Sequence, residues 1–205
     1  MKLLQYSEAV AALMGGNVVA VPTDTVYGVA ARLSDPQAVA RLFAVKRRPG
    51  HVALPVLVSS LHDVAELEVQ WPAGADILAA SNWPGALTIV VGAHPATAAR
   101  VGATNSLGLR WPHHDMLEGL IDECGPLAVT SANEHAHAPC ISVTDVLAAS
   151  WGAPLAGVLD GGRCAATVSS VVEFDEGGWH LRRQGAVDRA EIEALLGPES
   201  APGDD

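Results

Sequence analysis

The residues best suited to chemistry in this chain lie in the segment Pro22–Gly28, which reads PTDTVYG. Its two threonine hydroxyls and one carboxylate come directly after the apolar run Val18–Val21. An apolar run that ends at a proline is typical of a buried strand that opens into a polar loop. In open α/β sheets, ligands bind beyond the carboxyl ends of the strands. The segment therefore predicts a polar site for a small ligand.

A basic cluster, Lys46–Pro49, follows one predicted helix later. Positive charge near the end of a helix is favourable against the helix dipole without any ligand, so the cluster alone is ambiguous. Pro49 and Gly50 force the chain out of the helix, which would allow Lys46 and Arg48 to point into the crevice at the strand ends. Cations beside hydroxyl groups suit a small anionic substrate next to a phosphate.

Three further strand ends carry cations or small polar groups. Arg110 ends an apolar run, where an arginine can either fork onto a ligand carboxylate or form an ordinary ion pair. Residues Val129–Asn133 suit contact with phosphate oxygens or the edge of a base, although such residues also form ordinary turns. Arg182 and Arg183 end a third run. Each feature alone is weak, but together in an acidic protein they indicate one anion-binding site.

The elements that must position these residues alternate along the chain. The predicted strands are Val18–Val21, Leu54–Val58, Leu87–Val91, Leu107–Arg110, Leu127–Thr130, Ala156–Leu159, Ser170–Phe174 and Trp179–Arg182. Their alternation with helices predicts one α/β domain over residues 1–197, with a twisted, largely buried sheet flanked by helices. The closely spaced strands near the C-terminus predict a mixed sheet rather than a purely parallel one.

Helix starts are predicted from capping residues. The predicted helices are Ser7–Gly15, Gln37–Val45, Ser60–Leu67, Trp71–Trp83, Asp115–Cys124, Thr144–Ala149 and Asp188–Leu196. Ser7 and Asp115 are expected to be N-caps, and Asp35 caps its helix ahead of a proline at the first helical position. Asp188 and Glu191 have the spacing of a capping box.

Composition narrows the class of protein. The chain has 205 residues, 49% of them apolar, and a net charge of −11 with only 12 Lys and Arg residues, which argues against an extended nucleic-acid interface. No apolar run approaches the roughly 18 residues of a membrane span, and the N-terminus turns polar too early for a signal peptide. We therefore expect a cytoplasmic protein. The tail 198–205, rich in Pro, Gly and acidic residues, is expected to be disordered.

The order of the motifs resembles the YrdC/TsaC family of L-threonylcarbamoyladenylate synthases, which act in the tRNA modification t6A. PTDTVYG, K-x-R-P, WPGALT, an arginine before a strand exit, TSAN, SSVV and LRRQG follow one another from the first helix to Leu196. The resemblance implies a YrdC-like fold of the single-domain form. It also implies that L-threonine, bicarbonate and ATP with Mg²⁺ give threonylcarbamoyl-AMP and pyrophosphate, and that the product passes to a t6A transferase complex.

The resemblance assigns roles to residues in two groups. Thr25, Arg110 and Ser169 match positions that bind L-threonine, with Arg110 on its carboxylate. The positions that match ATP-binding residues are Lys46, Arg48, Ser131, Asn133 and Arg183. Lys46 and Arg48, which face the nucleotide phosphates in this comparison, are also the expected catalytic pair. No protein metal site is expected.

The chain departs from the family pattern in two stretches. Val52 and Leu57 stand where members often have Asn and His, and Glu134–Ala136 replaces the usual x-S-G after SAN. Pro139 replaces a frequent serine. These changes keep open a second hypothesis, a YrdC-like nucleotide- or RNA-binding paralogue without synthase turnover. A third hypothesis is a YrdC-like domain that makes another acyl adenylate, as in carbamoyl-transfer enzymes.

Overall fold

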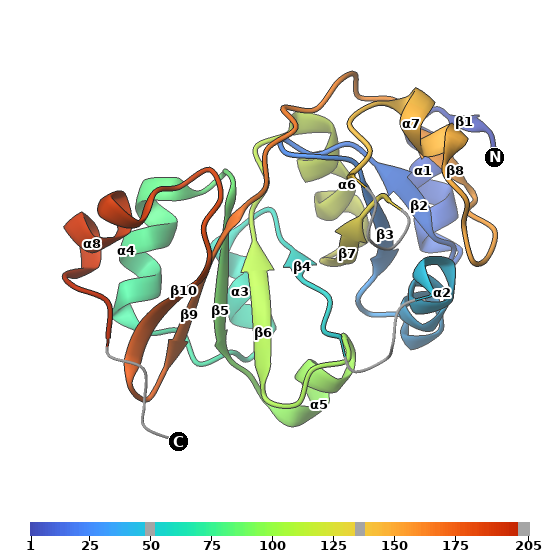
Figure 1. Ribbon diagram of the computed structural model, residues 1–205. Helices are drawn as coiled ribbons and strands as arrows, with labels where there is room; N and C mark the ends of the chain where they lie inside the picture. Colours follow the sequence, from blue (N-terminus) through green and yellow to red (C-terminus); the bar gives the residue numbers. More distant parts are fainter. Residues whose placement is uncertain (48–51, 134–137, 201–205) are drawn as a thin grey trace.

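The computed structural model describes residues 1–47, 52–133 and 138–200 (Figure 1). Within these ranges the strands are β1 (Leu3–Leu4), β2 (Val19–Val21), β3 (Gly28–Arg32), β4 (Val56–Leu57), β5 (Leu87–Gly92), β6 (Ser106–Arg110), β7 (Leu127–Ser131), β8 (Gly157–Leu159), β9 (Ser170–Asp175) and β10 (Gly178–Arg183). They form one sheet in the order β1-β8-β2-β3-β7-β4-β6-β5-β9-β10. The sheet contains parallel pairs, such as β4 with β6, and antiparallel pairs, such as β5 with β6, which confirms the predicted mixed sheet.

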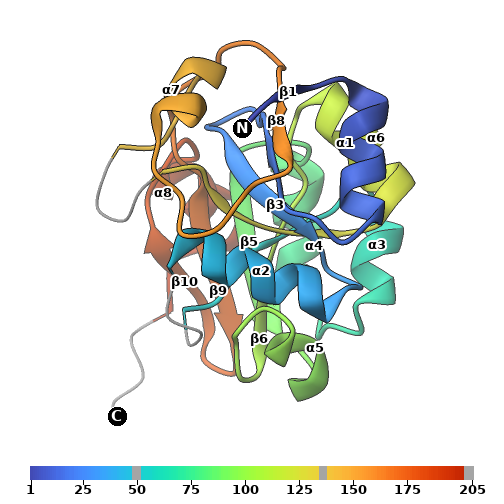
Figure 2. The same ribbon diagram turned by 90° about the vertical axis from the view of Figure 1, so that its right-hand side faces the viewer.

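Helices cover the sheet. They are α1 (Tyr6–Met14), α2 (Pro36–Lys46), α3 (Leu61–Glu66), α4 (Ala73–Asn82), α5 (Pro95–Ala99), α6 (Asp115–Cys124), α7 (Val143–Ala148) and α8 (Arg189–Leu196). Helices α1 and α6 lie side by side (Figure 2), whereas α4 and α8 pack together near β9 and β10 (Figure 1). None of the helices in the described ranges is long and apolar enough to cross a membrane.

The central strands are buried on both faces. On β2, Val19 and Val21 pack in one apolar cluster with Leu13 of α1 and Leu117 of α6, whereas Ala20 belongs to the larger cluster on the other face. Successive side chains of a strand point to opposite faces, so a strand with helices on both sides must be apolar at every position. This requirement explains the uninterrupted apolar run from which the strand is predicted.

Two of the predicted N-caps are wrong by one or two residues. Helix α1 begins after Gln5, not at Ser7, and the Glu8 carboxylate accepts a 2.9 Å hydrogen bond from the Gln5 backbone N–H. Helix α6 has His114 as its N-cap, and Asp115 lies inside the first turn. An acidic residue within the first turn also compensates the helix dipole, so its presence does not locate the cap itself.

The predicted capping box of the last helix does not form. Asp188 precedes α8, but its side chain caps no helix N–H and accepts instead from Gln184 Nε2 at 3.0 Å. The start of the tail contacts the fold, because the Glu199 carboxylate accepts a 2.7 Å hydrogen bond from the backbone N–H of Leu181 on β10. Residues 201–205 lie outside the described residues.

Strands β1 and β3 and helix α5 were not predicted. Strand β3 is built of Gly, Val, Ala and Arg, residues with mostly low strand propensity, yet it pairs with β2 and β7 at the centre of the sheet. The predicted strand 54–58 contributes only Val56 and Leu57 to the ladder. Pro55, which has no backbone N–H, interrupts it.

Candidate functional site

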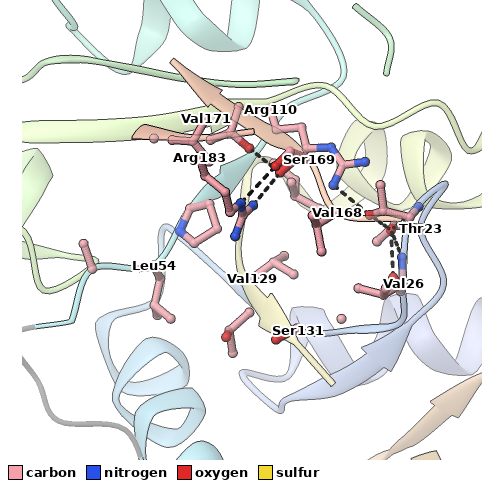
Figure 3. A pocket seen from close by; sticks show the side chains of 18 of the residues that line it. Thr23, Val26, Leu54, Arg110, Val129, Ser131, Val168, Ser169, Val171 and Arg183 are labelled. Carbon is pink, nitrogen blue, oxygen red and sulfur yellow. Dashed lines mark hydrogen bonds between the residues drawn. The ribbon is translucent and has the colours of Figure 1, made fainter. Parts of the chain in front are cut away.

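A cavity of about 480 Å³ opens over the middle of the sheet (Figure 3). Its walls come from the loop after β2, from β5, β6 and β7, and from the segment before β9. The polar side chains that line it are Thr23, Thr25, Thr88, Ser106, Arg110, Thr130, Ser131, Ser169 and Arg183. No carboxylate occurs among the described lining residues, and the two cations give the cavity a positive character. Such a cavity suits an anionic ligand.

Arg110, at the end of β6, is held by three acceptors from two other segments. Its Nε donates to the Gly85 carbonyl at 3.0 Å, Nη1 to Thr25 Oγ1 at 2.9 Å and Nη2 to Asp24 Oδ1 at 2.5 Å. Its side chain is only 9% exposed, so the pair with Asp24 is buried. A guanidinium has five N–H donors, and these contacts to described residues use three, which leaves two for a ligand.

The loop after β2 is shaped by its own threonine. Thr23 Oγ1 accepts from the backbone N–H groups of Thr25 at 3.0 Å and Val26 at 3.2 Å, and donates to the Val26 carbonyl at 2.7 Å. Such local side-chain bonds offer the backbone a turn in place of a strand. Buried Tyr27 ties the loop to residues beyond β8, because its hydroxyl donates to the Gly162 carbonyl at 2.8 Å. The loop therefore presents Thr25 to the cavity from a fixed backbone.

Ser169 and Arg183 form the opposite wall. Arg183 donates from Nε to the Ser169 carbonyl at 3.0 Å and from Nη2 to Ser169 Oγ at 2.9 Å, and Thr88 Oγ1 lies 3.0 Å from Ser169 Oγ (Figure 3). Burial, and then the charge of Arg110, lower the pKa of Arg183 from its ordinary value. The partial burial of Arg183 and the charge of Arg110 near it both disfavour the charged form, and Arg183 has no acidic partner among the described residues.

A close approach of backbone places Arg183. A Cβ on Gly185 would collide with the Val168 carbonyl, so only glycine allows the segment after β10 to cross the start of β9. Ser170 secures the crossing, because its hydroxyl accepts from the Gly185 N–H at 2.8 Å and donates to the Val187 carbonyl at 2.6 Å. The LRRQG motif thereby brings Arg183 onto Ser169.

Lys46, at the end of α2, joins the TSAN segment at the end of β7. Its Nζ donates to the Ser131 carbonyl at 2.8 Å, to Asn133 Oδ1 at 2.9 Å and to the Asn133 carbonyl. Ser131 Oγ also donates to Asn133 Oδ1 at 2.7 Å. The lysine and the strand end predicted to share a site are therefore in direct contact, with Ser131 on the cavity wall.

The predicted site residues fall into three groups. Those that line the cavity are Thr25, Arg110, Ser131, Ser169 and Arg183. Lys46 and Asn133 do not line it but contact Ser131. Arg48 lies outside the described residues.

Sequence reasoning missed Thr23, Asp24 and Thr88 as partners of the predicted ligand-binding groups. Thr23 and Asp24 lie within the PTDT motif, where only Thr25 was given a role. Thr88 is the polar residue of an otherwise apolar strand, which is the one signal that could have identified it. The described residues contain no group of three His, Cys, Asp or Glu side chains able to hold a metal ion.

The chain was compared with known proteins. Residues 11–185 match the sequence model of the Sua5/YciO/YrdC family, whose description reads "Telomere recombination". The chain is 38% identical over 193 residues to the Mycobacterium leprae protein named "Putative threonylcarbamoyl-AMP synthase", covering 93% of this chain and 87% of that protein. It is 33% identical over 198 residues to the threonylcarbamoyl-AMP synthase of Bacillus subtilis, covering 95% of this chain and 57% of that longer protein.

Solved structures give the same grouping. Pyrococcus abyssi Sua5 complexed with L-threonine has a TM-score of 0.89 at 28% identity, covering 97% of this chain and 61% of that chain. Escherichia coli YciO, at 18% identity, has a TM-score of 0.77 over 91% of this chain and 92% of its own, and it supports the fold alone. From the family match over most of its length and from its identity to these relatives, the chain belongs to the Sua5/YciO/YrdC family.

Proposed function

We propose that this protein is a threonylcarbamoyl-AMP synthase, which forms threonylcarbamoyl-AMP and pyrophosphate from L-threonine, bicarbonate and ATP. The names of its relatives support this activity. The observation that carries it is the setting of Arg110, which contacts Thr25 and has two donors left in a cavity that Ser169 also lines and that has no described carboxylate. A buried guanidinium with donors to spare is suited to bind the carboxylate of an amino acid.

The chemistry requires several anions in one place. Bicarbonate and the amine of threonine give a carbamate with loss of water, and a carbamate oxygen then attacks the α-phosphorus of ATP and expels pyrophosphate. Positioning and fixed positive charge are the main catalytic needs of such a step. Arg110 supplies buried charge at the threonine end. Arg183, expected from the resemblance to bind ATP, donates to Ser169 and so adds its charge next to the threonine site, and Lys46 holds the Ser131–Asn133 segment for the nucleotide. The apolar wall of Val90, Val101 and Val171 suits a purine base.

Mg²⁺ enters this proposal with ATP. Mg²⁺ in nucleotide sites is held by phosphate oxygens, waters and one or two carboxylates. Because no carboxylate lines the described part of the cavity, we assign the ion to the triphosphate rather than to a protein cage. The roles of Arg48 toward the phosphates and of a t6A transferase as acceptor of the product, and a cytoplasmic location, belong to the same proposal.

Pyrophosphate release tests the function. With Mg²⁺, release is expected only when L-threonine, bicarbonate and ATP are all present, and valine should replace threonine poorly, because a site that pairs with a hydroxyl rejects an isostere without one. No release with all three substrates would favour the binding paralogue without turnover. The net charge of −11 disfavours the RNA-binding form of that alternative.

A further inference from the structure

Val168 is a large apolar residue that is exposed in the wall of the cavity. It is 43% exposed, and no other large apolar residue among the described lining residues is exposed. Its side chain points into the cavity next to Ser169 (Figure 3). An exposed apolar side chain gains free energy when an apolar group of a ligand covers it.

The exposure of Val168 does not come from a loosely held loop. Within residues 164–170, backbone hydrogen bonds tie every second residue to a different part of the fold. These bonds join the Cys164 N–H to the Ile141 carbonyl at 2.9 Å, the Ala166 N–H to the Thr25 carbonyl at 2.9 Å, the Ala186 N–H to the Val168 carbonyl at 3.0 Å and the Ser170 N–H to the Ala86 carbonyl at 3.0 Å. Ala166 also has a φ of 65°, a left-handed conformation that a residue other than glycine keeps only where its surroundings hold it. The cavity therefore receives Val168 from a fixed backbone.

The neighbours of Val168 along this segment place it at the threonine end of the cavity. Ser169 is the next residue and lines the same cavity. Two residues before Val168, Ala166 binds the carbonyl of Thr25, whose hydroxyl accepts from Arg110 Nη1 at 2.9 Å. Along the chain, Val168 thus lies between the residue bonded to Thr25 and Ser169.

The group that meets Val168 follows from the chemistry of L-threonine. On the proposed function, on which this inference rests, Arg110 binds the carboxylate, and Cβ is the second carbon from it. Cβ carries a hydroxyl, which suits the hydroxyl groups of Thr25 and Ser169, and a methyl group, which suits an apolar surface. We propose that Val168 contacts the β-methyl group of L-threonine and makes the site prefer threonine to serine.

The polar residues of the cavity cannot supply this preference. The carboxylate, the amine and the hydroxyl are common to threonine and serine, and the two amino acids differ only in the β-methyl group. L-Serine would leave the side chain of Val168 uncovered, whereas L-threonine removes both the valine and its own methyl group from water. One methyl group in an apolar contact changes affinity by about tenfold.

The dissociation constants of L-threonine and L-serine, measured by NMR titration of the full chain, test the proposal. Wild-type protein is expected to bind L-threonine about tenfold more tightly than L-serine. Val168→Ala is expected to weaken L-threonine about fivefold and L-serine by less than about twofold. Val168→Thr keeps the shape of valine but replaces a methyl group by a hydroxyl, and it is expected to weaken L-threonine about threefold.

Ile77→Ala is the matched control, since Ile77 is 45% exposed on α4 and does not line the cavity. It should leave both dissociation constants unchanged. Because both amino acids are titrated into the same preparation, a partly unfolded variant does not alter their ratio.

Two outcomes would overturn the inference while the proposed function stands. One is equal weakening of both amino acids by Val168→Ala, which would show that Val168 only shapes the wall. The other is an unchanged ratio of the two dissociation constants in both Val168 variants, with pyrophosphate release still dependent on L-threonine. Wild-type protein that binds neither amino acid and releases no pyrophosphate would instead remove the proposed function itself.

Discussion

Arg110 is where three segments of the chain meet, because its guanidinium binds the Gly85 carbonyl, the Thr25 hydroxyl and the Asp24 carboxylate. A buried ion pair is costly to form, and breaking it by removing one partner costs about 3–5 kcal/mol. Asp24 therefore fixes Arg110 in orientation more than it adds stability. Since Asp24 does not line the cavity, the arginine presents its remaining donors to the ligand from a fixed position.

The substitution Arg110→Lys keeps the positive charge but loses the planar guanidinium and its several N–H donors. A lysine ammonium donates from one point and cannot reach three acceptors spread around a plane. We expect the KM for L-threonine to rise about tenfold or more, with the KM for ATP changed much less, and the unfolding free energy to fall by about 2 kcal/mol. Steady-state kinetics and denaturant unfolding measure both effects. Arg182→Lys is the matched control, since Arg182 pairs with Glu173 at 2.5 Å on the exposed hairpin; a similar KM change there would contradict the assignment.

Two adjacent serines allow function and stability to be separated. Ser169 Oγ faces the cavity and accepts from Arg183, whereas Ser170 is fully buried and its hydroxyl bonds Gly185 and Val187. Ser169→Ala should reduce kcat/KM for L-threonine about tenfold and change the unfolding free energy by less than about 1 kcal/mol. Ser170→Ala should lower the unfolding free energy by about 2 kcal/mol, because it leaves buried backbone groups unpaired. The reverse pattern in the two assays would refute the division of roles.

At this scale the sequence predicts which groups converge but not what holds them. Thr25 and Arg110 were predicted from polar residues at strand ends and Ser169 from the family resemblance, and the structure brings all three to one cavity. Neither the pairing of Asp24 with Arg110 nor that of Thr88 with Ser169 was predicted, because each joins residues far apart in the chain. Contacts of this kind depend on the order of strands in the sheet, which local patterns do not contain.

Among the elements, α2 matters for the site because its last residue is Lys46. Its start is firmly capped, since Asp35 Oδ1 accepts from the backbone N–H groups of Gln37 at 2.9 Å and Ala38 at 3.1 Å. The sequence predicted this cap correctly from an acidic residue ahead of a proline. It was wrong about Asp188, which has the same chemistry but bonds Gln184. The type of a capping residue alone therefore does not predict whether its side chain bonds the helix backbone or another side chain.

The two aspartates make a matched pair of variants. Asp35→Ala removes two cap bonds and should lower the unfolding free energy by about 1 kcal/mol. Asp188→Ala removes no helix cap and should change it by less than about 0.5 kcal/mol. Denaturant unfolding at neutral pH measures both. If both variants lost the same unfolding free energy, the loss would come from removing a carboxylate and not from the hydrogen bonds of the Asp35 cap.

On the scale of the whole molecule, the site depends on a strand order that is far from the order of the sequence. Strand β9 lies next to β5 near one edge of the sheet, whereas β8, the strand before it in the chain, lies near the opposite edge. The segment between β8 and β9 therefore crosses the sheet (Figure 1). This crossing brings Ser169 to Thr88 and Arg110. The periodicity of apolar residues predicts the individual strands and helices but not the order of the strands in the sheet. That order was indicated only by the resemblance of the motif series to the YrdC/TsaC family.

The two tyrosines of the chain report on the intact fold at alkaline pH. Burial, with Glu123 nearby for Tyr6, raises the pKa of Tyr6 and of Tyr27 to about 12 from an ordinary value of 10.0. Between pH 10 and pH 12 the folded protein keeps phenolic protons that the unfolded chain releases. The contribution of the tyrosines to the unfolding free energy is therefore fully present below pH 10 and declines as the pH rises toward 12. For fully buried Tyr27 the loss is about 2 kcal/mol. Phenolate absorbance should therefore stay low at pH 10, and Tyr27→Phe should flatten the alkaline decline of the unfolding free energy. Half-ionisation of the tyrosines at pH 10 in the folded protein would contradict this account of their burial.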